Sequence, residues 1–245
     1  QATFKTIVDT LDRQLDYHIV GVTHDKNGNP QYKRAAFLRN SRDFGVPQNR
    51  PRVYIVAFSR AYFGQHISLL PKDAPTKRLR APVFESLEDV LDKKVDSRFF
   101  LSSGYLETLE KHIVTQHNKG YGFGYCIVNA PEIENPIANT LLATGGSGRE
   151  RNLIYDPING ASCAGTSIKG KYSPINDKFV RTMTPNEWGR LQGFIGYAFV
   201  DENGTDHFMF PEGIPNVQKF KQFGNSVTIP VIEEYALFIQ QCCNT

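Results

Sequence analysis

The sequence of 245 residues predicts an α/β fold, with the last third of a doubly wound sheet followed by a small, mostly β domain. Residues 2–15 carry apolar side chains at 3.6-residue spacing, which predicts an amphipathic helix leading into a strand at residues 17–22. Residues 53–58 form an unbroken apolar run, typical of a parallel strand covered on both faces. Glycines alternate with aromatics over residues 120–125, which predicts a twisted strand in the small domain.

The predicted sheet is too small to be stable alone. The Asn27-Gly28 pair predicts a hairpin tip between its two main strands. Sheets of two or three strands rarely bury enough surface for independent stability. The front of the sheet is therefore expected on another segment, and because the chain begins at Gln1 we expect residues upstream that were removed or lie elsewhere.

Composition restricts the classes of function. The formal net charge of +3 permits nucleic-acid binding without requiring it. Four cysteines lack C-x-x-C spacing and six histidines are scattered, which argues against zinc and against a disulfide framework and favours a reducing compartment. Neither an apolar run of membrane-spanning length nor a signal peptide is present. The sequence predicts a soluble, cytoplasmic protein with no metal and no membrane contact.

A proline-flanked segment ahead of the apolar run carries three planar hydrogen-bonding side chains. In extended backbone Gln48, Arg50 and Arg52 project to one side, because side chains alternate along a strand. Pro47 and Pro51 place this row at a strand entrance or an edge. The row presents amide and guanidinium donors, and solvated or salt-bridged arginines are the alternative.

A connection rich in proline and glycine follows at residues 59–84. It carries the basic side chains Lys77, Arg78 and Arg80. They could clamp phosphates, or could simply be solvated.

The middle of the chain contains a strand end followed by a glycine-rich loop, residues 139–152. It has no lysine, which excludes a P-loop, and a flexible linker is the alternative. Glycines allow backbone to reach base edges, and one arginine on guanine can contribute roughly 1–3 kcal/mol of discrimination. The glycines and arginines of this loop are Gly145, Gly146, Gly148, Arg149 and Arg151.

Residues near position 184 predict a short capped helix. Thr184 is the N-cap and Glu187 completes a capping box, while Gly193 ends the helix. Arg181 and Arg190 can brace the neighbouring loops.

The C-terminal segment predicts a turn and a last helix. The turn lies at Gly224 and Asn225, and Pro230 begins the helix. Val231 and Tyr235 share one face of that helix.

Three of these segments resemble, in order, signatures of the cytosine-5 DNA methyltransferases. Residues 48–52 match Gln-x-Arg-x-Arg, residues 181–194 match Arg-x-Leu-Thr-Pro-x-Glu-x-x-Arg-Leu-Gln-Gly-Phe, and residues 224–227 match Gly-Asn-Ser-Val. Met183 replaces the usual leucine, and Ile195 replaces a proline that follows the second signature. The resemblance implies a Rossmann-like methyltransferase sheet with a target-recognition domain.

The resemblance also implies double-stranded DNA as partner and S-adenosylmethionine as cofactor. It implies that Arg52 contacts the flipped-out target cytosine and that the glycine-rich loop enters the major groove. The positions implied to bind DNA are Gln48, Arg50, Arg52, Thr140, Leu141, Gly145, Gly146, Arg149 and Arg151. The positions implied to line the cofactor pocket are Asn225, Ser226 and Val227.

The same resemblance, which covers residues 38–240, divides the chain into three parts. Residues 1–72 are the C-terminal part of the catalytic domain, and residues 73–215 are the target-recognition domain. Residues 216–245 are the closing motif and a helix that returns to the catalytic domain.

The nucleophile of this chemistry is missing from the chain. The family uses a thiolate from a Pro-Cys-Gln loop and an acid from a Glu-Asn-Val segment. None of the four cysteines follows proline, and neither Glu-Asn-Val nor the Phe-x-Gly-x-Gly cofactor loop occurs. Two interpretations remain: the C-terminal half, fragment or split subunit of a restriction-modification methyltransferase that needs its N-terminal half, or a catalytically inactive DNA-binding specificity module.

Overall fold

The computed structural model describes residues 2–121, 125–144 and 148–244, and has a mixed helix and strand fold. Its α-helices are α1 (Ala2–Asp9), α2 (Arg60–Phe63), α3 (Ser103–Asn118), α4 (Pro157–Gly160), α5 (Pro185–Leu191), α6 (Asn216–Asn225) and α7 (Ile229–Cys243). Short 3₁₀ and π-helical turns are η1 (Thr10–Gln14), η2 (Arg34–Phe37), η3 (Ser41–Phe44), η4 (Gly64–Leu69), η5 (Glu88–Val90), η6 (Ser97–Phe99), η7 (Arg149–Asn152) and η8 (Phe194–Ala198).

The strands are short and occur in pairs. They are β1 (Tyr17–Ile19), β2 (Thr23–His24), β3 (Pro30–Gln31), β4 (Leu38–Asn40), β5 (Gln48–Asn49), β6 (Pro51–Val53), β7 (Ala57–Ser59), β8 (Ala138–Asn139), β9 (Leu153–Tyr155) and β10 (Val180–Thr182). The pairs β1–β7, β2–β3, β4–β6 and β9–β10 are antiparallel, and β5–β8 is parallel.

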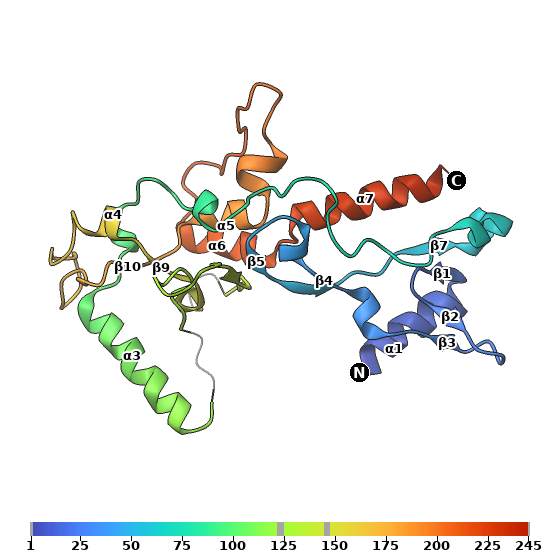
Figure 1. The fold of residues 1–245 in the computed structure, drawn as a ribbon, viewed down its shortest axis with the longest axis horizontal. Helices are drawn as coiled ribbons and strands as arrows, with labels where there is room; N and C mark the ends of the chain where they lie inside the picture. The colour runs from blue at the N-terminus through green and yellow to red at the C-terminus, as the bar shows by residue number, and fades with distance from the viewer. Residues whose placement is uncertain (1, 122–124, 145–147, 245) are drawn as a thin grey trace.

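The molecule is elongated (Figure 1). Helix α1 and strands β1, β2, β3 and β7 lie at one end, and α3 and α4 lie at the other. Helix α7 runs from the middle of the molecule back toward β7, so the last helix lies beside the first strands. Its buried side chains share a cluster with Val20, Val56 and Phe58 from that end.

The prediction of a parallel strand over residues 53–58 was wrong. This segment pairs antiparallel with β4 at its start, where Val53 faces Leu38, and with β1 at its end, where Ala57 faces Ile19. Val53 is 54% exposed, so one face of its strand is open. A continuous apolar run does not distinguish a two-sided parallel strand from the middle of two antiparallel pairings. The described residues contain no doubly wound parallel sheet.

The prediction that residues 73–215 are mostly β was also wrong for the described part of the chain. Its strands β8, β9 and β10 have two or three residues each, whereas α3 alone has 16. Of the predicted glycine–aromatic strand, residues 122–124 lie outside the described residues, and Ile127 makes a single parallel bridge to Leu153.

Several local predictions are confirmed. Helix α1 and η1 cover almost all of the predicted N-terminal helix, and the Asn27-Gly28 turn joins β2 to β3 with φ +75° at the glycine. The Thr184 hydroxyl accepts from Glu187 N–H, and the Glu187 carboxylate accepts from Thr184 N–H, which is the predicted capping box of α5. On α7, Val231 and Tyr235 are buried on one face, as their spacing predicts.

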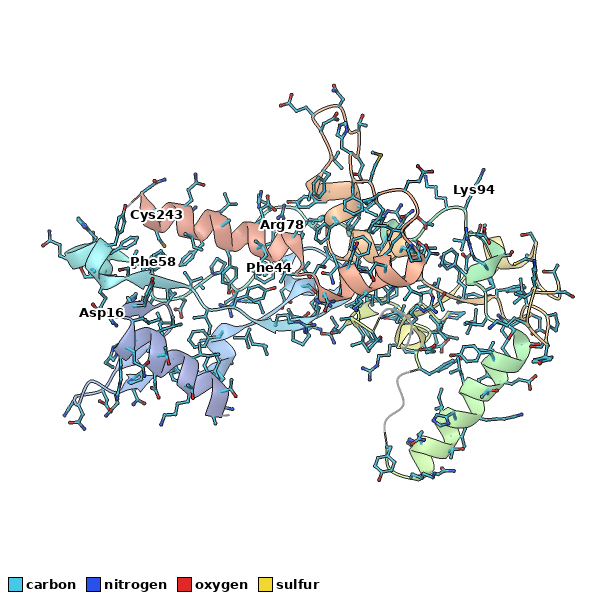
Figure 2. The ribbon with its side chains drawn as sticks, turned by 180° about the vertical axis from the view of Figure 1, so that it is seen from behind. Asp16, Phe44, Phe58, Arg78, Lys94 and Cys243 are labelled. Atoms are coloured by element: carbon cyan, nitrogen blue, oxygen red, sulfur yellow. The ribbon has the colours of Figure 1, made fainter. Side chains whose placement is uncertain are left out.

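Two of the three basic side chains of the connection, Arg78 and Arg80, bind carboxylates of α7, so these two are not merely solvated. Arg78 ion-pairs with Glu233 and Glu234 of α7, at 2.9 and 3.3 Å, and donates to the Tyr197 hydroxyl. Arg80 binds the same two carboxylates. Figure 2 shows Arg78 beside the start of α7. The connection is therefore fastened to the last helix, which its local sequence did not indicate.

Among the described residues, no helix combines the length and apolar character needed to cross a membrane.

Candidate nucleic-acid interface

The parallel pair β5–β8 joins two segments that the sequence assigns to DNA binding. Gln48 faces Ala138, and Asn49 faces Asn139. Beyond the pair, the Thr140 hydroxyl donates to the Asn49 carbonyl at 2.8 Å. The Gln-x-Arg-x-Arg segment and the Thr-Leu segment therefore form one surface, although about 90 residues separate them in the chain.

Gln48 lies inside the protein and not on that surface. Its side chain is fully buried, and its amide donates to the Leu191 carbonyl at the end of α5 over 2.9 Å. The prediction that Gln48 presents a donor to DNA does not fit this structure, because the donor is occupied by protein backbone.

Arg50 is also buried and is only 4% exposed. Its guanidinium donates to the carbonyls of Leu141 at 2.8 Å, Gly224 at 2.9 Å and Ser226 at 2.8 Å. Burial lowers the pKa of Arg50 to about 10, because the cation is desolvated. This burial differs from the predicted DNA contact: the Arg50 side chain joins the Thr-Leu segment to the closing motif.

Arg52 is the exposed member of the predicted row. Its guanidinium bonds to the carbonyl of Pro51 at 2.7 Å. Across the β4–β6 pair its partner Arg39 is buried against the Ala36 and Ala74 carbonyls. Of the three side chains in the row, only Arg52 is available to an external partner.

The Thr-Leu segment has one buried and one partly exposed residue. Leu141 is part of the largest apolar cluster, with Trp188 and Phe220, so the prediction that its side chain enters a DNA groove does not fit this structure. Thr140 is half-buried at the edge of the surface. The fold thus uses Leu141 as an anchor for the loop that follows it.

The closing motif packs against this loop without room for a side chain at Gly224. A Cβ atom at Gly224 would lie 2.3 Å from the Leu142 carbonyl oxygen, which real contacts do not allow. Asn225 and Val227 are exposed beside this contact, and the Ser226 hydroxyl donates to the Phe223 carbonyl at 2.7 Å. Gly224 therefore sets the distance between the closing motif and the recognition segment.

Gly224→Ala is expected to lower the free energy of unfolding by about 1–3 kcal/mol, because the added methyl group forces two backbone segments apart. Urea unfolding followed by circular dichroism measures this. Gly104→Ala is the matched control: it lies in helix α3, where a Cβ meets only the Ser173 hydroxyl at 3.0 Å and alanine favours the helix. Equal losses for the two variants would contradict the steric argument.

The glycine-rich loop is described only in part. Gly145 and Gly146 lie outside the described residues. Arg149 is half-buried with its guanidinium 5.2 Å from the centre of the Phe220 ring, a cation–π contact. Arg151 is exposed, and its carbonyl accepts from the Asn139 amide at 2.8 Å. The loop is thus tied to β8 and to α6 at its C-terminal end.

Asparagines hold this surface together, and the sequence analysis missed them. The side-chain oxygen of Asn40, Oδ1, accepts from the Arg50 backbone N–H, and its side-chain amide donates to the Asn49 side chain. Asn152 accepts from Asn139 N–H at 2.6 Å. These side-chain bonds join residues 9 to 13 positions apart in the chain, so no local signal marks them.

The framework behind the surface is a buried ion cluster around Arg181. Its guanidinium donates to Asp156 at 2.7 Å and, through two nitrogens, to Glu187 at 3.0 and 2.8 Å. Arg190 reaches the Asp92 carboxylate at 2.7 Å and the Val90 carbonyl. The expectation that Arg181 and Arg190 brace neighbouring loops is confirmed.

Two of the four cysteine thiols are partly withdrawn from solvent. Burial raises the pKa of the Cys163 and Cys242 thiols, which leaves less of the reactive thiolate. The described residues contain no group of three or more His, Cys, Asp or Glu side chains that could hold a metal ion.

Comparison with known proteins identifies the family. The model of the C-5 cytosine-specific DNA methylases matches residues 2–241. Type II methyltransferase M.HpaII of Haemophilus parainfluenzae is 34% identical over 231 residues, which are 94% of this chain and 53% of the relative. Type II methyltransferase M1.ScrFI of Lactococcus lactis subsp. cremoris is 28% identical, over 96% of this chain and 46% of the relative. The chain spans about half the length of the curated relatives it matches.

Solved structures share the fold at low sequence identity. The Entamoeba histolytica methyltransferase EhMeth superposes with a TM-score of 0.56 at 17% identity, over 97% of this chain and 57% of that protein. A DNMT2 variant of Spodoptera frugiperda gives a TM-score of 0.53, over 97% of this chain and 62% of that protein. The family match over residues 2–241, almost the whole chain, shows that this chain belongs to the C-5 cytosine-specific DNA methylase family.

Proposed function

We propose that this chain is the C-terminal part of a DNA (cytosine-5-)-methyltransferase and that it recognises a short sequence in duplex DNA. The buried Arg50 carries the proposal, because its three hydrogen bonds join the Gln-x-Arg-x-Arg, Thr-Leu and Gly-Asn-Ser segments. A desolvated cation held by backbone carbonyls alone is costly, and a framework that keeps it must fix these segments precisely. The proposed division at residues 72 and 215 follows from the same motifs.

The proposed DNA surface consists of the exposed groups that this framework mounts. Arg52 and Thr140 lie on either side of β5–β8, and Arg151 follows at the end of the glycine-rich loop. We assign Arg52 to the target cytosine and the glycine-rich loop, including Gly145, Gly146 and Arg149, to the major groove. Gln48, Arg50 and Leu141 position these groups from behind and do not contact DNA in this proposal.

The cofactor of the proposed enzyme is S-adenosylmethionine, which supplies the methyl group. Asn225 and Val227 fit one wall of its pocket. Asn225 ends α6 and Val227 lies in the connection to α7, their amide and aliphatic side chains are exposed, and the carbonyls of Gly224 and Ser226 beside them accept from Arg50. The remaining walls would come from the N-terminal part of the sheet. That part also supplies the thiolate and the ring-protonating acid.

A second polypeptide segment with those groups is the proposed partner. Two exposed apolar patches suit it: Leu38 and Val53, which face each other across β4–β6, and Ile232 and Ile239, seven residues apart on one face of α7. Exposed apolar surface of this kind marks contact sites between protein segments. The segment can be part of the same chain or a separate subunit.

The second candidate function is a catalytically inactive DNA-binding specificity module. It is favoured by one observation: all the proposed base-reading groups lie in this chain, whereas the nucleophile does not. An open reading frame with an in-frame Pro-Cys-Gln beside this one, or its absence, separates the two functions.

Replacing the base-reading arginine of the glycine-rich loop should relax sequence specificity. Arg149→Ala or Arg151→Ala in the complete enzyme is expected to cost roughly 1–3 kcal/mol of binding free energy on the cognate duplex and little on random DNA. Binding curves on cognate and random duplexes at two salt concentrations measure this.

A phosphate contact gives a different result in the same curves. Its loss weakens binding to every duplex alike and lowers the salt slope by about one unit. Arg13→Ala is a control distant from the loop, since Arg13 bonds Asn29 at the N-terminal end. Equal losses on both duplexes for both loop variants would exclude base reading by these arginines.

A further inference from the structure

A polar cleft of about 270 Å³ lies between η7 and the N-terminus of α3. It is lined by residues from η6, the start of α3, η7 and the loop that contains Lys171. Its volume is several times the ~30 Å³ of one water molecule in the liquid, so it can hold a tetrahedral oxyanion with some hydration. Because Arg149 and Glu150 line it, the cleft is continuous with the end of the proposed recognition loop.

The charges around this cleft favour an anion. Arg98, Arg149 and Lys171 line it, against the single carboxylate of Glu150. Glu150 is engaged, because one of its oxygens accepts from the Tyr105 hydroxyl at 2.8 Å. Lys171 is exposed and makes no ion pair with any described residue, so its charge is not compensated within that part of the protein.

The N-terminus of α3 adds the positive end of its dipole, while its first two N–H groups bond within the protein, Ser103 N–H to the Pro174 carbonyl and Gly104 N–H to the Ser173 hydroxyl. The helix has 16 residues and no acidic side chain in its first turn, so the positive end of its dipole is not neutralised there. Its N-cap residue, Ser102, makes no side-chain cap bond to the helix. N-cap serines normally use their hydroxyl for such a bond.

Ser102 itself points to a ligand. The residue is 7% exposed, lines the cleft, and its hydroxyl has no hydrogen-bond partner among the described residues. The Ser102 oxygen is not among the fully buried side-chain atoms without a partner, so it is open to the cleft, where a bound anion would accept its hydrogen. The cleft therefore combines uncompensated positive charge with an unused donor on a helix N-terminus.

We propose that this cleft is a phosphate subsite that takes a DNA backbone phosphate flanking the recognised sequence. Ser102 donates to the phosphate from the start of α3, and Lys171 supplies the charge from the facing loop. Arg98 lies beside them, in a 3.1 Å ion pair with Asp96 on the surface. Phosphates are held in this way by lysines, serine hydroxyls and helix N-termini in other DNA-binding proteins. The proposal rests on the proposed DNA-binding function and adds a fixed register for the loop.

Equilibrium binding of the full chain to a short labelled duplex tests the subsite. Lys171→Ala should lower the slope of log K against log salt by about one unit, on cognate and random DNA alike. Ser102→Ala should weaken binding several-fold with an unchanged slope, since it removes a neutral donor. Lys119→Ala, at the C-terminal end of α3, is the matched control and should change neither. A slope for Lys171→Ala equal to that of Lys119→Ala would overturn the proposal.

Inorganic phosphate tests the same subsite without DNA. In titrations followed by NMR, the Ser102 and Tyr105 amide signals should shift saturably, and Lys171→Ala should reduce the effect. Amides that do not respond would overturn the subsite even where DNA binds. Conversely, a chain that binds phosphate in the cleft but no duplex would refute the proposed DNA-binding function of the isolated chain and leave an anion site of another origin. A melting temperature within about 2 °C of wild type shows that a variant is folded, because a loss of 1 kcal/mol in unfolding free energy lowers the melting temperature by about 4 °C.

Discussion

The purified chain should transfer no methyl group from S-adenosylmethionine to DNA above the uncatalysed background. Attack on the cytosine ring needs a thiolate, and proton transfer to the ring needs an acid. None of the four cysteines follows proline, and burial raises the pKa of Cys163 and Cys242. Incorporation of tritiated methyl groups into duplex DNA measures this, with the full-length H. parainfluenzae relative as positive control.

Complementation separates the two candidate functions. A polypeptide made of the part of that relative that this chain does not match should restore transfer when mixed with this chain, if the two parts make one enzyme. Cys243→Ser, at the exposed cysteine of α7, should leave the result unchanged. Turnover by this chain alone would refute the proposal that its nucleophile is elsewhere.

The sequence predicts the elements whose signals are local. The capping box of α5 needs only Thr184 and Glu187, three residues apart, and the structure shows both of its hydrogen bonds. The buried face of α7 follows from the helical spacing of its apolar residues. In both cases the interacting positions lie within one turn of each other, so the pattern contains the answer.

The candidate site is less accessible to sequence reasoning because its contacts are distant in the chain. The acceptors of Arg50 lie 91, 174 and 176 residues away, and the acceptor of Gln48 lies 143 residues away. Alternation along a strand predicts the direction of these side chains but not what covers them. An arginine that faces solvent and one that faces a buried carbonyl can have the same local sequence. The structure is what shows that, of Gln48, Arg50 and Arg52, only Arg52 lies on the candidate surface.

The strand pairing fails for a related physical reason. Apolar character reports burial and not the direction of the neighbouring strand. After Pro51, the Tyr54 N–H donates to the Phe37 carbonyl. Farther along, the Val56 carbonyl accepts from the Val20 N–H. These partners are fixed by the hairpin and loop geometry of residues 20–45, which the run itself does not encode.

Removing the guanidinium of Arg181 should be among the most destabilising single changes in this chain. Arg181 is fully buried, and its two carboxylate partners have side-chain exposures of 10% for Asp156 and 0% for Glu187. Arg181→Ala leaves both carboxylates without their cation, and breaking buried pairs in this way costs about 3–5 kcal/mol. Urea unfolding should show that loss. Arg190→Ala is the matched control, because its pair with Asp92 is partly exposed and should cost clearly less.

The two carboxylates of this cluster also accept hydrogen bonds from backbone N–H groups. A change at Arg181 therefore removes the ion pairs without removing an acceptor of those backbone bonds. Glu187 accepts from the backbone N–H groups of Thr184 and Asp92, and Asp156 accepts from Asn159 N–H. Replacing the acids would therefore remove caps as well as the ion pair. Arg181→Lys keeps the charge but loses the planar fork that reaches both carboxylates, so an intermediate loss is expected.

The effect of Arg181→Ala should also depend on pH. Burial by itself raises the pKa of Asp156, but the Asn159 N–H and the Arg181 guanidinium outweigh it and hold this pKa below its usual value. A lowered folded-state pKa contributes stability above the unfolded value of about 3.9, and that stability is lost as the pH falls through the folded value. The difference in unfolding free energy between wild type and Arg181→Ala should therefore be largest near neutral pH and narrow below about pH 4. A difference that stays constant from pH 7 to pH 3 would show that Arg181 stabilises the fold through packing and not through its ion pairs.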